Sequence, residues 1–112
     1  MASTDDIWIV DFGEPYPAEP AAHRPALVIG PPDTFGIDFP FVILVPLTTT
    51  RRGLSLHVEI EPSVETGLRE TSYVQCELIR SVNRQRLVRR IGDVSSDVSH
   101  QVSTVIRTLL GY

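Results

Sequence analysis

The spacing of hydrophobic and polar residues predicts a series of short strands followed by one helix. Six segments are rich in β-branched and aromatic residues and are bounded by glycine- and proline-rich loops, as strands usually are. These segments are residues 7–12, 24–30, 41–48, 54–61, 72–82 and 88–94. Residues 54–61 alternate with a period of two, which predicts one buried face. Residues 72–82 suit a strand pair or one long bent strand, and residues 83–87 a single helical turn.

The period changes near the C-terminal end of the chain. Apolar residues there recur at intervals of three and four, which is typical of an amphipathic helix. They are Val98, Val102, Val105, Ile106 and Leu109. Ser95 or Ser96 can cap this helix, Asp97 favours its first turn, and Gly111 can end it. We therefore expect a mostly β fold with a C-terminal helix (α+β), in which the helix packs on a strongly bent sheet or partly open barrel.

Arg24 stands directly before Pro25 at the mouth of an apolar strand. Arginine keeps its positive charge at physiological pH, so this position needs an anionic partner or water. Two readings stay open: Arg24 pairs with Asp11 or Glu19, or it binds an anion that is not part of the protein. The proline-rich loop at residues 13–23 precedes it, and loops of this length between strands are often functional.

Length and composition set the class of protein. The 112 residues fit one compact domain, residues 1–112. Cys76 is the single cysteine, so an internal disulfide is excluded, and we expect this side chain to fill a small apolar space in the core. The N-terminus has no signal-peptide pattern, and no apolar run approaches the ~20 residues of a membrane span. These features predict a cytoplasmic protein without a membrane partner.

Charge is distributed unevenly along the chain. The net charge of −4 alone argues against nucleic-acid binding, yet all ten basic residues are arginines and most stand in two clusters. These clusters are Arg51–Arg52 and the set Arg80, Arg84, Arg86, Arg89 and Arg90. The clusters predict either a basic patch that follows phosphates or a solvated face whose arginines pair with carboxylates.

Several common kinds of site are absent from the sequence. His23, His57 and His100 are scattered, and with one cysteine they form no metal-binding pattern. The chain has no glycine loop for phosphates or dinucleotides and no G-x-S-x-G motif. We therefore predict no metal and no cofactor, and we expect His57, in an alternating strand, to be structural.

The order of segments resembles the MazF/PemK/Kid family of type II toxin–antitoxin toxins. The resemblance runs from about Asp6 to Gly111 through "DDIWIVDF", "HRPALVI", "VILVPLTTT", "SYVQCELIRSVNRQRLVRRIGDVS" and "LLGY". It implies a small SH3-like barrel of the MazF/Kid/CcdB type and a homodimer. It also implies metal-independent cleavage of single-stranded RNA (mRNA, tRNA or rRNA) and a cognate antitoxin as partner.

The same resemblance assigns the site residues. It places the catalytic arginine and threonine at Arg24 and Thr48, with Glu77 and His23 as further catalytic candidates. Expected RNA-binding residues are Glu19, Thr49, Arg51, Gln75 and Arg80. Kid-like members carry an arginine and an aspartate where this chain has Gln75 and Glu77, so one positive charge is lost and the acid is one methylene longer.

Metal-independent RNA cleavage uses the ribose 2′-hydroxyl as nucleophile and leaves a 2′,3′-cyclic phosphate and a 5′-hydroxyl. It needs a base, a group that stabilises the charged phosphorane, and an acid. Arg24 suits the second role because its planar fork can hold two phosphate oxygens, and Thr48 can donate its hydroxyl to a non-bridging oxygen. The base stays open between Glu77, Glu19 and His23.

Two other functions fit the same fold. A weak or inactive family member would bind RNA or an antitoxin without cleavage, and a CcdB-like toxin would poison DNA gyrase through the terminal helix.

Overall fold

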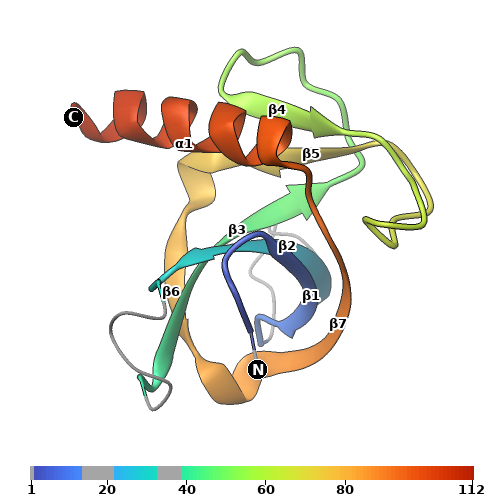
Figure 1. Cartoon of the computed structure of the whole chain (residues 1–112), viewed down its shortest axis with the longest axis vertical. Helices are drawn as coiled ribbons and strands as arrows, with labels where there is room; N and C mark the ends of the chain where they lie inside the picture. The colour runs from blue at the N-terminus through green and yellow to red at the C-terminus, as the bar shows by residue number, and fades with distance from the viewer. Residues whose placement is uncertain (1, 14–21, 33–38) are drawn as a thin grey trace.

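The computed structural model describes residues 2–13, 22–32 and 39–112. The described part of the chain forms β-strands and short 3-10 turns, followed by one C-terminal helix (Figure 1). They are β1 (Asp6–Asp11), β2 (His23–Gly30), β3 (Phe41–Thr48), β4 (His57–Ile60), β5 (Ser72–Gln75), η2 (Cys76–Leu78), β6 (Arg80–Asn83), η3 (Arg84–Arg86), β7 (Leu87–Asp93) and α1 (Ser96–Leu110). No helix in the described part of the chain is long and apolar enough to cross a membrane.

The strands form one antiparallel sheet in the order β4-β5-β3-β2-β1-β7, with β6 paired to β3. Strand β3 is its centre, because β2 pairs with it while β5 and β6 pair in turn with its last and first residues. The described strands do not close into a barrel, since the hydrogen-bonded path ends at β4 and β7. Figure 1 shows the sheet strongly curled below α1, which confirms the predicted mostly β, partly open architecture.

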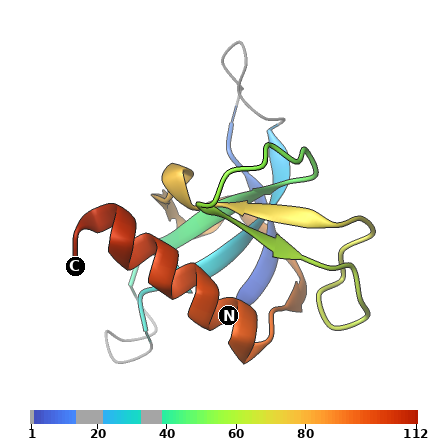
Figure 2. The same cartoon turned by 90° about the horizontal axis from the view of Figure 1, so that it is seen from above.

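The two faces of the sheet bury separate apolar cores. One core contains Leu27, Val45 and Leu47 from the strands together with Val102 and Ile106 from α1. Figure 2 shows α1 lying across the strands on this side. The other core contains the residues that alternate with these, among them Val10, Ala26, Val28 and Leu44. The sheet therefore carries apolar side chains on both faces, which explains the nearly continuous apolar runs of β2 and β3.

The predicted C-terminal helix is confirmed with its caps. The Ser95 hydroxyl oxygen accepts a hydrogen bond from the Val98 N–H at 3.3 Å, and Asp97 stands in the first turn. Gly111 ends the helix in the left-handed conformation, with φ of 79°, and its N–H donates to carbonyl oxygens of the last turn. Glycine adopts this conformation without the steric penalty that a Cβ atom brings.

The strand predicted at residues 54–61 is too long at its start. Strand β4 begins only at His57, whose N–H donates to the Leu54 carbonyl at 3.0 Å to close a turn. Leu54 is exposed, whereas Val58 and Ile60 are buried as the alternation predicts. The alternation of apolar and polar residues continues through this turn, so it does not mark where the strand begins. Leu54 fits the pattern although it stands outside the strand.

The segments after β4 match their predictions more closely. Strands β5 and β6 both pair with β3 and are interrupted by η2, which makes residues 72–82 a bent strand pair. Residues 84–86 form the predicted single turn, capped by the Asn83 side chain, which accepts from the Gln85 N–H at 2.8 Å.

Candidate active site

Polar side chains from β3, β5 and β4 meet on one face of the sheet. Thr48 is paired with Tyr73, and Gln75 with His57, in the antiparallel register. Residues directly opposite each other in neighbouring strands project to the same side, and alternate residues along a strand share that side. The four side chains therefore share one face, opposite to the α1 core.

Arg24 joins this face from β2. Ala26 is paired with Pro46 in the register of β2 and β3, so Arg24 and Thr48, two residues further along, project to the same side. The Arg24 side chain is buried, with the residue only 8% exposed. The fold thus places Arg24 and Thr48 on the same face of the sheet, at the end of the second core.

Two acceptors hold the Arg24 guanidinium in place. Its Nη2 donates to the Leu47 carbonyl oxygen and, at 2.7 Å, to the Gln75 Oε1. Gln75 is itself only 6% exposed, so both ends of this contact are shielded from water. Burial lowers the pKa of Arg24 from its ordinary value to about 10. Because this pKa is still well above 7, the guanidinium stays charged at neutral pH.

Of the two readings left open for Arg24, an ion pair with Asp11 is not formed. Asp11 pairs in register with His23, and its Oδ2 lies 3.8 Å from the His23 Nε2. Of the carboxylates that the structure describes, none lies within salt-bridge distance of Arg24, and Glu19 lies outside the described residues. Among the described residues, the buried guanidinium of Arg24 meets only neutral oxygen acceptors, and none of the carboxylates there neutralises its charge.

His23 does not reach the Arg24 face. It precedes Arg24 directly in β2, and adjacent residues of a strand project to opposite sides. Its side chain is largely exposed and faces Asp11. The structure therefore does not bring together His23 and Arg24, although the two are neighbours in sequence.

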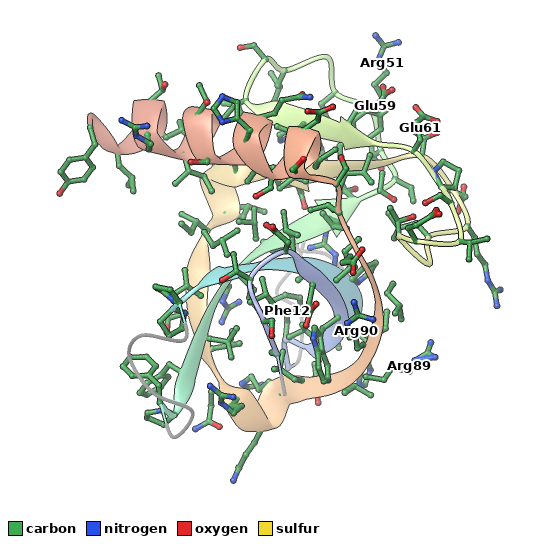
Figure 3. The ribbon with its side chains drawn as sticks, in the orientation of Figure 1. Phe12, Arg51, Glu59, Glu61, Arg89 and Arg90 are labelled. Carbon is green, nitrogen blue, oxygen red and sulfur yellow. The ribbon has the colours of Figure 1, made fainter. Side chains whose placement is uncertain are left out.

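Thr48 ends β3 and is half-buried. Its Oγ1 accepts a hydrogen bond from the Thr50 N–H at 3.2 Å, so the hydroxyl still has its own proton to donate. Thr49 and Arg51 follow on an exposed segment. Figure 3 shows Arg51 at one corner of the molecule with Glu59 and Glu61, and its charge lowers the pKa of Glu59 against the larger raising effect of Glu61. Arg51 therefore lies on the same exposed edge as two carboxylates, one of which feels its charge.

Glu77 is held by His57, a residue that we expected to be structural. The His57 Nε2 lies 2.9 Å from the Glu77 Oε2 and 3.0 Å from its Oε1. No short motif links the two residues, which are 20 positions apart. Sequence reasoning missed this contact because it depends on the pairing of β4 with β5 and on the turn η2 that follows.

Arg80 lies on the surface above Phe12. Its guanidinium carbon is 5.3 Å from the centre of the Phe12 ring, a cation–π contact. Phe12 packs against the second core inside the curl of the sheet, whereas Arg89 points outward from β7 (Figure 3). Arg80 keeps a charged, exposed guanidinium on a rigid support, which suits contact with a nucleic acid.

Part of the arginine cluster serves the fold itself. Arg90 pairs with Asp6 at 3.1 Å and with Asp93 at 2.8 Å. Arg86 donates to the Asp11 carbonyl oxygen at 3.2 Å. These contacts confirm the carboxylate-paired reading for Arg90, because its charge is already matched within the protein.

Two remaining expectations concern cysteine and metals. Cys76 is fully buried in the core shared with α1, as predicted, and burial raises the pKa of its thiol to about 11. Among the described residues, no three histidine, cysteine or acidic side chains gather closely enough to hold a metal ion.

Comparison with known proteins gives a consistent result. A sequence model of the PemK-like, MazF-like toxins of type II toxin–antitoxin systems matches residues 4–110. The endoribonuclease MazF6 of Mycobacterium tuberculosis and the endoribonuclease MazF2 of Mycobacterium bovis are each 28% identical to the chain over 113 residues, covering 98% of it and 97% of the relative.

Solved structures share the fold. The Mycobacterium tuberculosis toxin MazF-mt6 superposes with a TM-score of 0.75 at 24% identity, covering 95% of this chain and 96% of that one. MazF from Deinococcus radiodurans gives a TM-score of 0.81 at 21% identity, covering 99% and 97%. A mycobacterial endoribonuclease in complex with its cognate antitoxin gives 0.80 at 23% identity, covering 99% and 96%.

Proposed function

Because the chain belongs to the PemK-like, MazF-like toxin family of type II toxin–antitoxin systems, we propose that it is a metal-independent endoribonuclease toxin of single-stranded RNA. The observation that carries this proposal is the buried Arg24 guanidinium, held by Leu47 and Gln75 beside Thr48. A buried cation without a carboxylate partner among the described residues is a preformed site for an external anion. A scissile phosphate is such an anion.

The reaction follows from these groups. The 2′-oxygen attacks the adjacent phosphorus as a base takes its proton, and the bond from phosphorus to the 5′-oxygen then breaks. Two of the five N–H groups of Arg24 are used by Leu47 and Gln75, which leaves donors for the phosphorane oxygens. The Thr48 hydroxyl can donate to a further oxygen.

Arg24 is also our candidate for the acid. Burial lowers the pKa of Arg24 to about 10, so the guanidinium releases a proton more readily than an exposed arginine does. The leaving 5′-oxygen is a strong base and can take that proton, which Arg24 regains from water. The products are a 2′,3′-cyclic phosphate and a 5′-hydroxyl.

Glu77 is our candidate for the base. His23 projects from the other face of the sheet, and Glu19 lies outside the described residues. Glu77 follows Gln75 by two residues and is bound to His57, the cross-strand partner of Gln75. Its side chain is 34% exposed, which is compatible with access of a substrate hydroxyl to the carboxylate.

The remaining partners follow from the family and the surface. We assign the protein a cognate antitoxin, residues 1–112 as one toxin domain, and the cytoplasm as its location. We also assign it a homodimer, because Leu109 and Leu110 are exposed at the end of α1 and Leu78 is exposed on η2, which packs against that helix. Gln75 and Arg80 are assigned to the RNA groove, Gln75 through its hold on Arg24 and Arg80 by direct contact.

The test is cleavage of mixed RNA by the purified protein in EDTA. The wild-type protein should cut and leave 2′,3′-cyclic phosphate ends, and Arg24→Ala should lose most activity while its thermal unfolding stays cooperative. Arg69→Ala is the matched control, because Arg69 is exposed and lies on the loop before β5. An Arg24→Ala protein that cuts as fast as wild type would show that the assigned mechanism is wrong.

The same variants separate the rival functions. Binding of RNA by the wild-type protein without cleavage would identify an inactive family member. Growth inhibition that survives Arg24→Ala but is lost when residues 107–112 are removed would identify a gyrase poison instead.

A further inference from the structure

The contact between His57 and Glu77 joins two unlike environments. The His57 side chain is only 2% exposed, whereas the Glu77 side chain is 34% exposed. The Nε2 of His57 lies 2.9 and 3.0 Å from the two carboxylate oxygens of Glu77, so this nitrogen is almost equally close to both. A buried imidazole ring therefore contacts a carboxylate that reaches the surface.

The other nitrogen of the same ring lies in different surroundings. His57 Nδ1 is buried and makes no hydrogen bond to any residue that the structure describes. The geometry favours the tautomer with its proton on Nε2, because this nitrogen faces two acceptors and Nδ1 faces none. Burial of an unsatisfied ring nitrogen is unfavourable, so packing alone does not account for a histidine here.

The strand register connects this pair to the candidate active site. His57 is the direct cross-strand partner of Gln75, which accepts a hydrogen bond from Arg24 at 2.7 Å. Side chains in such a pair have Cβ atoms about 4.5–5.5 Å apart. The four residues Arg24, Gln75, His57 and Glu77 thus form one row across β2, β5, β4 and η2, with Glu77 at its exposed end.

We propose that His57 is a positioning residue for RNA cleavage: its Nε2–H orients the Glu77 carboxylate so that Glu77 takes the proton of the attacking 2′-hydroxyl. This inference rests on the proposed function. As the 2′-oxygen bonds to phosphorus, its proton passes to Glu77 and later to water. The bond from phosphorus to the 5′-oxygen breaks, and that oxygen takes its proton from Arg24.

The asymmetry of the ring permits a sharp test with three substitutions at one position. The amide nitrogen of His57→Gln can occupy the place of Nε2 and still donate to Glu77. The shorter amide of His57→Asn corresponds to Nδ1, which has no partner, and His57→Phe keeps the ring without a donor. The rate of RNA cleavage should therefore depend on a hydrogen-bond donor at the position of Nε2 and not on the volume of the ring.

Steady-state cleavage of a short fluorogenic RNA gives the first readout. We expect kcat to fall about 10- to 100-fold in His57→Phe and His57→Asn, with KM within about twofold of wild type, because a positioned base contributes ~10²–10⁴-fold. His57→Gln should recover most of the loss. A role in folding alone would lower the thermal unfolding midpoint without this difference between the amides.

Glu77→Gln provides a second route that does not disturb the buried ring. We expect it to lower kcat at least as much as His57→Phe, and the double variant to lose no more than Glu77→Gln alone, since both act through one carboxylate. If His57→Phe does not fold, Glu77→Gln with His57→Gln still decides the matter.

The outcomes separate this inference from the function on which it rests. If the wild-type protein cuts no RNA, the proposed function is wrong and the role of His57 is lost with it. If wild type cuts and either His57→Phe or Glu77→Gln cuts equally fast, only the positioning role is overturned. Equal activities of His57→Gln and His57→Asn, or additive losses in the double variant, would overturn it as well.

Discussion

Arg24 and Gln75 meet across the central strand of the sheet, although 51 positions separate them in sequence. The Arg24 Nη2 donates to the Gln75 Oε1 at 2.7 Å, and the Leu47 carbonyl between them accepts from the same nitrogen. The hydrogen bond to Gln75 orients the guanidinium. Because Gln75 is neutral, it does not neutralise the positive charge of Arg24. The residue that departs from the Kid-like pattern thus holds in place the arginine that we propose to be catalytic.

Gln75→Glu should therefore reduce cleavage even though it keeps the size of the side chain. A carboxylate at this position would form an ion pair with Arg24 and compete with the scissile phosphate. We expect kcat/KM to fall at least about tenfold, since that corresponds to about 1.4 kcal/mol of lost transition-state binding. Gln101→Glu, on the exposed surface of α1, makes the same change of charge away from the site and should leave kcat/KM unchanged.

The lowered pKa of Arg24 predicts how binding depends on pH. Burial lowers the pKa of Arg24 to about 10 by disfavouring the charged form, so the guanidinium is protonated below pH 10 and loses its charge above it. Affinity for an RNA analogue with a 2′-deoxy group at the scissile position should be constant from pH 7 to about 9 and fall above about 10. Fluorescence anisotropy measures this, and Arg24→Ala should lack the fall attributed to this group.

The lowered pKa of Arg24 also predicts how the free energy of unfolding depends on pH. The unfolded chain keeps its arginine protonated to a higher pH than the folded chain does, so burial of the charged Arg24 opposes folding below about pH 10. The contribution of this one group becomes less unfavourable as pH rises above 10. A phosphate analogue bound at neutral pH should offset this cost and raise the thermal unfolding midpoint in wild type but not in Arg24→Ala.

Gly92 should be sensitive to substitution, because the backbone of residues 65–66 lies directly against it. A Cβ atom at this position in β7 would lie 2.3 Å from the Glu65 carbonyl oxygen and 2.4 Å from Thr66 backbone atoms. Gly92→Ala should therefore lower the free energy of unfolding by about 1–3 kcal/mol, as overpacking does. Chemical denaturation measures the change.

Gly53 offers the control for this prediction. It has a φ of 66°, and a Cβ atom there would meet no neighbour within 4 Å. Gly53→Ala should cost only the penalty of the left-handed conformation, about 1–2 kcal/mol. A loss in Gly92→Ala of less than about 1 kcal/mol would contradict the close approach of β7 to the turn at residues 63–67.

The exposed end of α1 predicts a substitution that should break the proposed homodimer. Leu110 is 56% exposed and Leu109 is its neighbour on the last turn. Leu110→Glu should shift the protein from dimer to monomer in analytical ultracentrifugation, because burial of a charge without a partner at an interface is costly. Thr104→Glu, on the same helix and also exposed, is a control for added charge. A wild-type protein that sediments as a monomer at all concentrations would rule out the dimer.

Much of the fold was predictable because its signals are local. The apolar runs of β2 and β3, the helical spacing after Ser95 and the glycine at 111 each act within a few residues. The start of β4 was not predictable in this way, since Leu54 continues the alternation but stands in a turn. Arg24 and Thr48 were predicted from a resemblance, and the register of β2 with β3 accounts for their meeting.

The sequence by itself determined the order of strands and helix and the family, and it pointed to Arg24 and Thr48 as the main catalytic candidates. Tertiary structure alone decided the partners of those residues: Gln75 rather than Asp11 for Arg24, and His57 for Glu77. The physical reason is that hydrophobic periodicity is encoded along the chain, whereas a hydrogen bond between strands depends on register. Register is set by packing of the whole sheet, so it brings His57 and Gln75 opposite each other without any local signal.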